Sequence, residues 1–341
     1  MGKVTQILML LTLLGLMAAC QQSSGGLYFT SDRDGNYEIY KRDISSDEDI
    51  NITQTAEDEY EAVLSPDKKW LVFRVGPENN SSIEVFNLDS GSEAERFPIS
   101  RGSGNFHSPV WNGSSDRIAF VGEVKNQGSK VFISGVRDSS PAKLSDIEAT
   151  EVGDWSSDGE SVVFSSDDNE RLGIHVRNPD GGNQREMTCG ADYGAVWSPD
   201  AKRLAFISER EGNPDIYGME RDAEDELCPT TKDSRKDVLR LTETDEPESD
   251  ISWSPDSKQL LFVSERDGNK EIYVMESSGN KQIRLTFNEK DDYSPIWSPD
   301  GRTIAFVSEL DGDPDIFTMD GSGQNQARIT NNDSADTHPR W

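Results

Sequence analysis

The chain has 341 residues, and its 64 acidic residues outnumber the 34 basic ones to give a formal net charge of −30. Such a surface repels the phosphates of nucleic acids, so we expect no nucleic-acid partner. A basic partner or a divalent cation would suit this charge, but an acidic surface that serves only solubility is the simpler interpretation. Hydrophobic residues form only 33% of the chain, yet they recur in regularly spaced triplets, which disordered chains lack.

The first 20 residues have the pattern of a secretory signal. Lys3 supplies a positive charge, and residues 7–17 form an apolar run that is too short for an ordinary membrane span. Residues 17–20, Met-Ala-Ala-Cys, resemble the lipobox of bacterial lipoproteins, in which the cysteine becomes the acylated N-terminus. The alternative is an ordinary signal peptide with an incidental cysteine.

The lipobox resemblance implies a lipid anchor on Cys20. In that family the next residue influences sorting, and Gln21 is not the aspartate that retains lipoproteins at the inner membrane. The resemblance therefore implies the periplasmic side of the outer membrane, in a Gram-negative host. Residues 21–26 are expected to form a short polar tether, which spans at most about 20 Å when fully extended and holds the folded body close to the membrane.

An internal repeat determines the expected fold of the remaining chain, residues 27–341. Its marker is the end of a short apolar segment, in most copies a tryptophan followed by a Ser-Pro-Asp or related turn. The markers are Leu64, Trp111, Trp155, Trp197, Trp253, Trp297 and Trp341. A spacing of about 44 residues is typical of the four-stranded blades of a β-propeller.

The copy at residues 293–330 shows how one blade is built. Residues 298–301, Ser-Pro-Asp-Gly, favour a tight turn, and Asp311-Gly312 is a hairpin signal. The strand between these turns is too apolar to face water, so we expect it to be covered on both faces. The four strands are predicted at residues 293–297, 303–307, 315–319 and 327–330.

Seven such units are expected to close a ring. The second strand occurs seven times and the first strand ends seven times, but the chain opens with a second strand and closes with a first strand. Residues 337–341 are therefore predicted to complete the blade that begins at Leu27, which leaves no open edge. The predicted fold class is all-β, a single seven-bladed propeller of four-stranded antiparallel blades, whose tryptophans pack between blades rather than bind a ligand.

The repeated pattern resembles that of the TolB-type propellers. Its parts are Trp-Ser-Pro-Asp-Gly, Ile-Ala-Phe-Val-Ser, Asp-Gly-Asn, Ile-Tyr-Val-Met and Arg-Leu-Thr, and they are most complete at residues 253–286 and 297–330. TolB itself has an N-terminal α/β domain before a six-bladed propeller and works with the peptidoglycan-associated lipoprotein. We expect no such domain here, because the first strand starts at Leu27. The resemblance therefore implies the repeat type and not the whole role in the Tol system.

Two enzyme classes carry the same repeat, and each needs residues that a sequence would reveal. The peptidase relatives need a Gly-x-Ser-x-Gly elbow and an α/β-hydrolase domain, and the sequence has neither. The oligogalacturonate lyases hold a divalent metal with clustered histidines. His107 and His338 could join Glu151 at a metal near one mouth of the channel, whereas His175 is expected in an outer strand. Polar loop residues are the simpler interpretation of both mouth histidines, so we expect no metal and no cofactor.

The loops that lead from one blade to the next are strongly acidic and should all emerge on one face. Residues four positions before each marker form a ring at that mouth of the channel. They are Tyr60, His107, Glu151, Tyr193, Ser249, Tyr293 and Thr337, with His338 beside the last. Because rigid blades hold these variable loops, we predict a recognition surface of Tyr60, His107, Glu151, Tyr193, Tyr293 and His338. The alternative is that these residues only solvate the mouth.

With Cys20 lipidated, two cysteines remain, and an even number in an oxidising compartment suggests a disulfide. Cys189 follows a fourth strand on the acidic face, whereas Cys228 lies in an insertion, residues 221–237, expected to leave by the opposite face. The insertion would have to wrap around the rim to bring Cys228 to Cys189. The sequence therefore leaves both pairing and two free thiols open.

Together these features predict a non-catalytic, membrane-anchored propeller of the bacterial cell envelope. Its partner would be an envelope protein, or peptidoglycan or another glycan, bound through the acidic channel-mouth loops. The alternative is a metal-dependent, lyase-like enzyme that degrades polysaccharide at the same mouth. A structural accessory to an envelope complex is a third hypothesis.

Overall fold

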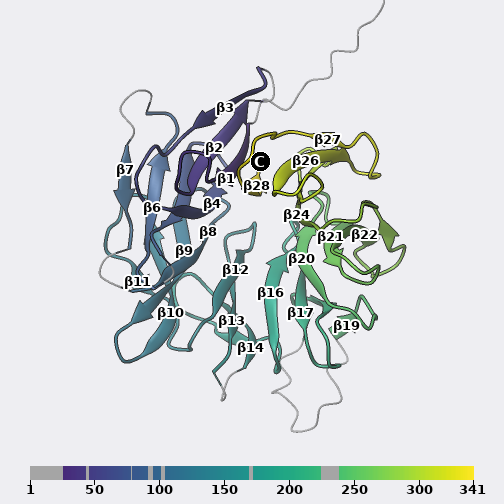
Figure 1. The fold of residues 1–341 in the computed structure, drawn as a ribbon. Coiled ribbons are helices and arrows are strands. Elements are labelled where there is room, and N and C mark those ends of the chain that lie inside the picture. The colour runs from purple at the N-terminus through teal and green to yellow at the C-terminus, as the bar shows by residue number, and fades with distance from the viewer. Residues whose placement is uncertain are drawn as a thin grey trace, which may run out of the picture.

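A computed structural model describes residues 26–43, 46–77, 79–90, 95–100, 104–168, 172–223 and 238–341. These residues contain 28 strands and no helix, which confirms the all-β prediction (Figure 1). No helix within these ranges is long and apolar enough to cross a membrane. The predicted signal peptide, residues 1–20, and nearly all of the tether, residues 21–26, lie outside the described residues.

The strands form seven antiparallel four-stranded sheets, the blades, which stand around a central axis (Figure 1). We number them I to VII in chain order and write each from its innermost strand outward. Blade I is β28 (Asp336–Arg340), β1 (Leu27–Ser31), β2 (Glu38–Asp43) and β3 (Glu48–Asn51). Blade II is β4 (Glu59–Leu64), β5 (Trp70–Val75), β6 (Ser82–Asn87) and β7 (Arg96–Pro98). Blade III is β8 (Phe106–Trp111), β9 (Arg117–Val124), β10 (Gly128–Gly135) and β11 (Ala142–Lys143).

The remaining four blades follow the same order. Blade IV is β12 (Glu151–Trp155), β13 (Val162–Ser166), β14 (Gly173–Arg177) and β15 (Arg185–Glu186). Blade V is β16 (Asp192–Trp197), β17 (Arg203–Ser208), β18 (Asp215–Glu220) and β19 (Val238–Arg240). Blade VI is β20 (Glu248–Trp253), β21 (Gln259–Ser264), β22 (Glu271–Glu276) and β23 (Ile283–Arg284). Blade VII is β24 (Asp292–Trp297), β25 (Thr303–Ser308), β26 (Asp315–Asp320) and β27 (Ala327–Arg328).

The core lies between the blades and is built from the repeated apolar triplets. A phenylalanine at the same place in each second strand is fully buried: Phe29, Phe73, Phe120, Phe164, Phe206, Phe262 and Phe306. The tryptophan markers that end the inner strands of blades III to VII are also buried, at 4–9% exposure. Trp111 donates its indole N–H across to Val63 of blade II, and Trp253 donates to Val196 of blade V. The prediction that the tryptophans pack between blades is therefore confirmed.

The outermost strands are shorter than the sequence pattern predicts. In blade VII the strand expected at residues 327–330 covers only Ala327–Arg328. Beyond it, the Thr330 hydroxyl accepts the Ile316 N–H at 2.9 Å and also donates to buried Asp315. The Thr330 hydroxyl thus accepts the Ile316 N–H in place of a backbone carbonyl of the outer strand, and strand β27 ends earlier than predicted.

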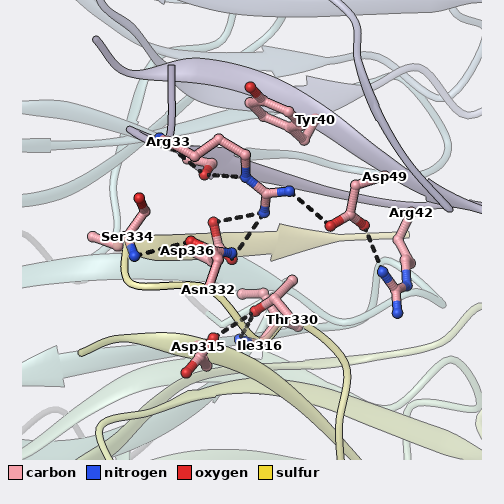
Figure 2. A network of polar contacts seen from close by, with 12 residues as sticks. Arg33, Tyr40, Arg42, Asp49, Asp315, Ile316, Thr330, Asn332, Ser334 and Asp336 are labelled. Carbon is pink, nitrogen blue, oxygen red and sulfur yellow. Dashed lines mark hydrogen bonds and ion pairs between the residues drawn. The ribbon is translucent and has the colours of Figure 1, made fainter. Parts of the chain in front are cut away.

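The C-terminal strand closes the ring as predicted. β28 pairs antiparallel with β1, with Ser31 opposite Asp336 and Tyr28 opposite Arg340. Figure 2 shows the polar contacts that join the last blade to the first at this point. Asp336 accepts two hydrogen bonds from Arg33, which follows β1, and a third from Asn332 in the loop from blade VII. Arg33 also pairs with Asp49 of β3, so the guanidinium ties the innermost strand of blade I to its outermost one.

Candidate functional site

The inner strands carry a β-bulge near the start, next to the channel. Each of them shows a register shift against its neighbouring strand. In six blades the bulge contains a residue with positive φ: Glu61, Ser108, Gly194, Asp250, Ser294 and His338. A bulge re-aims the side chains around it, so these strands do not follow simple alternation at the channel mouth.

Carboxylates in these bulges tie adjacent blades together. Glu61 Oε2 accepts the backbone N–H of Ser108 in the next blade at 2.6 Å. Asp250 Oδ2 accepts the N–H of Ser294 at 2.8 Å in the same way. Glu151 serves both its own blade, through the Ser165 hydroxyl, and the next, through the N–H of Gly194. The mouth is therefore held rigidly by charge-assisted hydrogen bonds to the backbone.

The residues predicted to form the recognition surface occupy equivalent places on successive inner strands. Tyr60, His107, Glu151, Tyr193 and Tyr293 are all partly buried and stand at the base of the bulge. We call these five side chains the mouth ring. Their places in the strand register are equivalent, and their role as a recognition surface stays a prediction.

Electrostatic interactions link members of the mouth ring and the side chains around it. Burial lowers the pKa of His107, while the charges of Glu61 and Glu151 oppose that shift. Burial, with the charges of Glu209 and Glu151, raises the pKa of Tyr193. The pKa of Tyr293 rises to about 12, chiefly through burial. These tyrosines therefore remain neutral phenols that donate and accept hydrogen bonds near neutral pH.

Tyr60 is part of a compact cationic and aromatic group. The Arg74 guanidinium lies 4.9 Å from the centre of the Tyr60 ring and forms an ion pair with Glu61 at 3.2 Å. On its other side Tyr60 contacts Tyr37, with ring centres 5.2 Å apart. This arrangement places an aromatic surface and both signs of charge on neighbouring positions of the mouth.

His338 lies one position further along than the mouth ring, in the bulge of β28. Its ring nitrogen Nδ1 is 2.9 Å from the Thr337 hydroxyl. Burial and the nearby Arg340 lower the pKa of His338, and the charges of Glu61 and Asp250 oppose that shift. His175 faces the interior of blade IV, where it stacks on Phe164 and is 1% exposed. Among the described residues, no three His, Cys, Asp or Glu side chains converge as metal ligands.

Two charged residues on the innermost strands, which we call the channel residues, were not predicted: Asp154 on β12 and Arg340 on β28. Burial raises the pKa of Asp154 to about 7, and among the described residues its carboxylate oxygens accept the backbone N–H groups of Trp155 and Trp197 and no side-chain donor. Burial also lowers the pKa of Arg340, and the charges of Asp250 and Glu61 oppose that shift. Within the described part of the chain, Arg340 forms no ion pair with a carboxylate.

The sequence did contain a signal for both channel residues. The position just before each marker is apolar in most repeats: Val63, Val110, Val196 and Ile296. Asp154 and Arg340 are the charged exceptions at that position. Because a charge on the innermost strand loses much of its hydration, a departure from the repeat at this place is informative.

A polar cavity of about 850 Å³ lies on the opposite face, between blades IV and V. Turns of both blades line it, and Arg221 crosses it to contact Asp158 and the Ser161 hydroxyl. The same guanidinium lies 5.4 Å from the centre of the Trp197 ring. The polar groups on Arg221 are thus largely engaged by the protein itself.

Cys189 lies in the loop after β15 and is disulfide-bonded. The other two cysteines of the sequence, Cys20 and Cys228, both lie outside the described residues. The pairing of Cys189 with Cys228 therefore stays a prediction. Most of the insertion at residues 221–237 also lies outside the described ranges.

Comparison with known proteins identifies the repeat family. The model of the TolB beta propeller domain matches residues 94–246 and 240–341. An uncharacterised protein of Agrobacterium fabrum is 26% identical over 225 residues, covering 64% of this chain and 70% of that protein. The Tol-Pal system protein TolB of Ruthia magnifica is 31% identical over 91 residues. These cover 27% of this chain and only 19% of that TolB.

Solved structures agree with this at the level of the fold. TolB from Acinetobacter baumannii superposes with a TM-score of 0.56 at 16% identity, covering 94% of this chain and 80% of that one. An oligogalacturonate lyase from Vibrio parahaemolyticus superposes with a TM-score of 0.67 at 15% identity, covering 87% and 86%. At such identities the likeness shows the fold alone. The repeat motifs and the match over residues 94–341 show that this chain belongs to the TolB β-propeller domain family.

Proposed function

We propose that the chain is a non-catalytic binding propeller of the bacterial cell envelope, which recognises a protein or a cell-wall glycan at the channel mouth. The observation that best supports this function is the mouth ring, in which three tyrosines, a histidine and a glutamate stand on bulged strands. Aromatic rings with polar tips contribute contact area and hydrogen bonds at a low entropy cost when the scaffold already holds them.

The position of this propeller in the cell is part of the proposal. The lipobox resemblance supports acylation of Cys20, which would hold the body on the periplasmic side of the outer membrane. The relative from Ruthia magnifica is a Tol-Pal system protein, which supports an envelope setting. Metabolic labelling with a radioactive fatty acid tests the anchor. We expect label in the parent protein and none in Cys20→Ala, and equal labelling of both would contradict it.

The alternative of a metal-dependent polysaccharide enzyme lacks a specific observation in its favour. The lyase-like neighbours are 15–16% identical to this chain and support only the fold. His107 and His338 share the channel with Glu61 and Arg74, but the described residues around them do not form a three-ligand set.

Site-specific photocrosslinking tests the proposed surface. A benzoylphenylalanine at position 193 would sit in the mouth ring, and one at position 50 would sit on the exposed outer strand β3 as a matched control. Irradiation of intact cells should give a discrete adduct from position 193 and none of the same mass from position 50. The same adduct from both positions, or none from position 193, would overturn the mouth as the binding surface.

A binding assay complements the crosslinks and separates the two classes of partner. The triple variant Tyr60→Ala, Tyr193→Ala, Tyr293→Ala should bind purified peptidoglycan sacculi at least about tenfold more weakly if the ligand is the glycan, since each ring contributes of order 1 kcal/mol. Ile50→Ala is the control and should bind like the parent. If neither the parent nor the variants bind sacculi, a protein adduct at position 193 still supports the protein class.

A further inference from the structure

A buried carboxylate at the start of the inner strand recurs in several blades, and an arginine neutralises it. In blade VI, Arg266 follows β21 and pairs with Glu248 at 2.9 Å. Its Nε donates to the Ser264 hydroxyl at 2.7 Å, and its guanidinium lies 4.6 Å from the centre of the Tyr273 ring. The blade thus forms a complete receptor for a guanidinium, made of a carboxylate, a serine and an aromatic ring.

Blades I and V contain the same receptor with the same occupant. Arg210 pairs with Asp192 at 3.0 Å and lies 4.6 Å from the Tyr217 ring centre. Arg33 pairs with Asp336 at 3.0 Å and lies 4.4 Å from the Tyr40 ring centre. In both blades the Nε–H of the arginine donates a hydrogen bond to the hydroxyl of the serine two positions earlier, and this bond helps to orient the guanidinium.

In blade II the buried carboxylate also pairs with a guanidinium, but the arginine comes from a different strand. The turn after β5 has Pro77 where blades I, V and VI have arginine. Arg96 from the outermost strand β7 instead reaches the buried Glu59 at 2.8 Å. Its guanidinium lies 5.1 Å from the ring centre of Phe73, and in blades I, V and VI the arginine lies 5.4–5.7 Å from the equivalent phenylalanine of the second strand. An arginine thus neutralises the carboxylate even when a different strand must supply it.

Blade VII has the receptor but no arginine. Leu310 stands at the position of Arg266, and Asp292 is the fully buried carboxylate. Asp292 Oδ2 accepts a hydrogen bond from Asn288 at 2.6 Å, and the side chains of Ser308 and Thr286 also interact with the carboxylate, so an amide and two hydroxyls take the place of a guanidinium among the described residues. Asp292 forms no ion pair with any described residue. Burial, aided by the charge of Glu271, raises the pKa of Asp292 to about 6.

The other parts of the blade VII receptor are in place. Ser308 occupies the position of Ser264 and is 2% exposed. Phe306 and Phe317 provide the aromatic pair, with ring centres 5.8 Å apart. Leu310 itself is 47% exposed, and this apolar side chain without a donor stands at the sequence position that carries the arginine in three other blades.

The surface beside this receptor is also unusual for so acidic a protein. Phe287, in the loop from β23 to β24 that leads to Asp292, is 71% exposed, the largest exposure of any large hydrophobic side chain in the described structure. Both Phe287 and Leu310 belong to loops at the same end of the propeller as the mouth ring. Exposed apolar side chains around a buried, unmatched charge are typical of a contact point for a partner.

We propose that the blade VII receptor binds an arginine side chain of a partner protein, which pairs with Asp292 and lies on the ring of Phe317 while Leu310 turns aside. A guanidinium fits better than an ammonium, because the occupied receptors use its planar face on a ring and its separate N–H groups on carboxylate and serine. The site goes beyond the mouth ring, and its occupancy does not depend on what the ring binds.

Methyl NMR on the full-length protein in detergent micelles tests the receptor with a defined probe. The probe is N-acetyl-arginine amide, and N-acetyl-citrulline amide is its neutral match. The Leu310 methyl signals of the parent should shift saturably with the arginine probe and respond at least about tenfold more weakly to citrulline, as expected for loss of a charge-assisted contact. Equal responses to both probes, or no saturable response to arginine, would overturn the proposal.

Two variants show where the probe binds. Leu310→Arg restores the arginine of the other blades, so it should fill the receptor from within and abolish the response, read on the Ile316 methyls behind it. Leu310→Met keeps an apolar side chain of similar size and should bind the probe like the parent. If Leu310→Arg still responds like the parent, the probe binds elsewhere and the proposal fails, whatever the mouth ring does.

Discussion

The seams between blades contain fully buried charges, whereas the innermost strands carry two partly buried ones, Asp154 and Arg340, and the two sets have different partners. In the seams, fully buried carboxylates such as Glu248 and Asp336 have an arginine at 2.9–3.0 Å. In the channel, Asp154 has only backbone N–H donors, and Arg340 has no ion-pair partner among the described residues. Each paired arginine and carboxylate belong to the same blade, as Arg266 and Glu248 do in blade VI, so the pair fixes how the strands of that blade meet, whereas an unpaired charge keeps a desolvation penalty that a ligand can relieve.

The seams therefore depend on directed hydrogen bonds and ion pairs as well as on apolar burial. At the closing seam the Asp336 carboxylate receives Arg33 from one side and Asn332 from the other (Figure 2). A buried ion pair adds little net stability against an apolar alternative, but loss of one partner is costly. The seams should therefore tolerate loss of either charge poorly, and the channel should tolerate it well.

Removal of the closing strand should have the largest effect. Deletion of residues 337–341 removes most of β28 and the packing of Trp341 against the cluster that contains Leu27 and Phe29. We expect a loss of about 5 kcal/mol or more in the free energy of unfolding, which is comparable to the total stability of many domains. Thermal unfolding followed by circular dichroism measures it. A truncated protein that melts like the parent would contradict the closure.

Loss of a seam arginine should rank next. Arg266→Ala leaves Glu248 buried without its cation, and we expect a destabilisation of about 3–5 kcal/mol in urea unfolding. Arg302→Ala removes an exposed arginine from the next blade and should change stability by less than about 0.5 kcal/mol. Equal effects of the two substitutions would show that Arg266 does not stabilise the fold by neutralising a buried carboxylate.

The blades could be predicted from the sequence because the repeat itself carries the physical pattern. Turn residues, apolar triplets and marker tryptophans recur together, so each copy supports the others, and the position of β28 follows from counting. The two channel charges were missed because the repeat was recognised from the residues that most copies share, and residues that depart from this pattern were not considered. Asp154 and Arg340 stand where four other copies have an apolar residue, and Leu310 stands where three other copies have an arginine. The pairing of Glu59 with Arg96 could not be read from the repeat, because it comes from a different strand.

The unmatched seam carboxylate of blade VII gives a prediction that depends on pH. Asp292 has a folded-state pKa of about 6, above its ordinary 3.8, so the folded protein holds the proton more tightly than the unfolded chain. Stability should therefore fall as pH rises from about 4 to 6, and the cost stays constant above that range. We expect Asp292→Asn to be more stable than the parent by about 2–3 kcal/mol at pH 7.5, with the gain shrinking toward pH 4.

Urea unfolding at several pH values measures this effect. Asp333→Asn changes an exposed carboxylate in the loop from β27 to β28 and should shift stability by less than about 0.5 kcal/mol. If the gain of Asp292→Asn over the parent were the same at pH 4 and pH 7.5, the buried charge would not be its cause.

The channel arginine should give the smallest change in stability. Burial lowers the pKa of Arg340, which means that the protein holds this guanidinium at a desolvation cost that Asp250 and Glu61 offset only in part. Arg340→Gln removes the charge but keeps a long polar side chain, so we expect a change of less than about 1 kcal/mol in either direction. Arg266→Gln is the matched substitution in a seam and should destabilise severalfold more. If Arg340→Gln and Arg266→Gln lower the free energy of unfolding equally, Arg340 has a structural role. If only Arg266→Gln is costly, the channel charge is free for recognition, and Arg340→Gln should then weaken the crosslink from position 193.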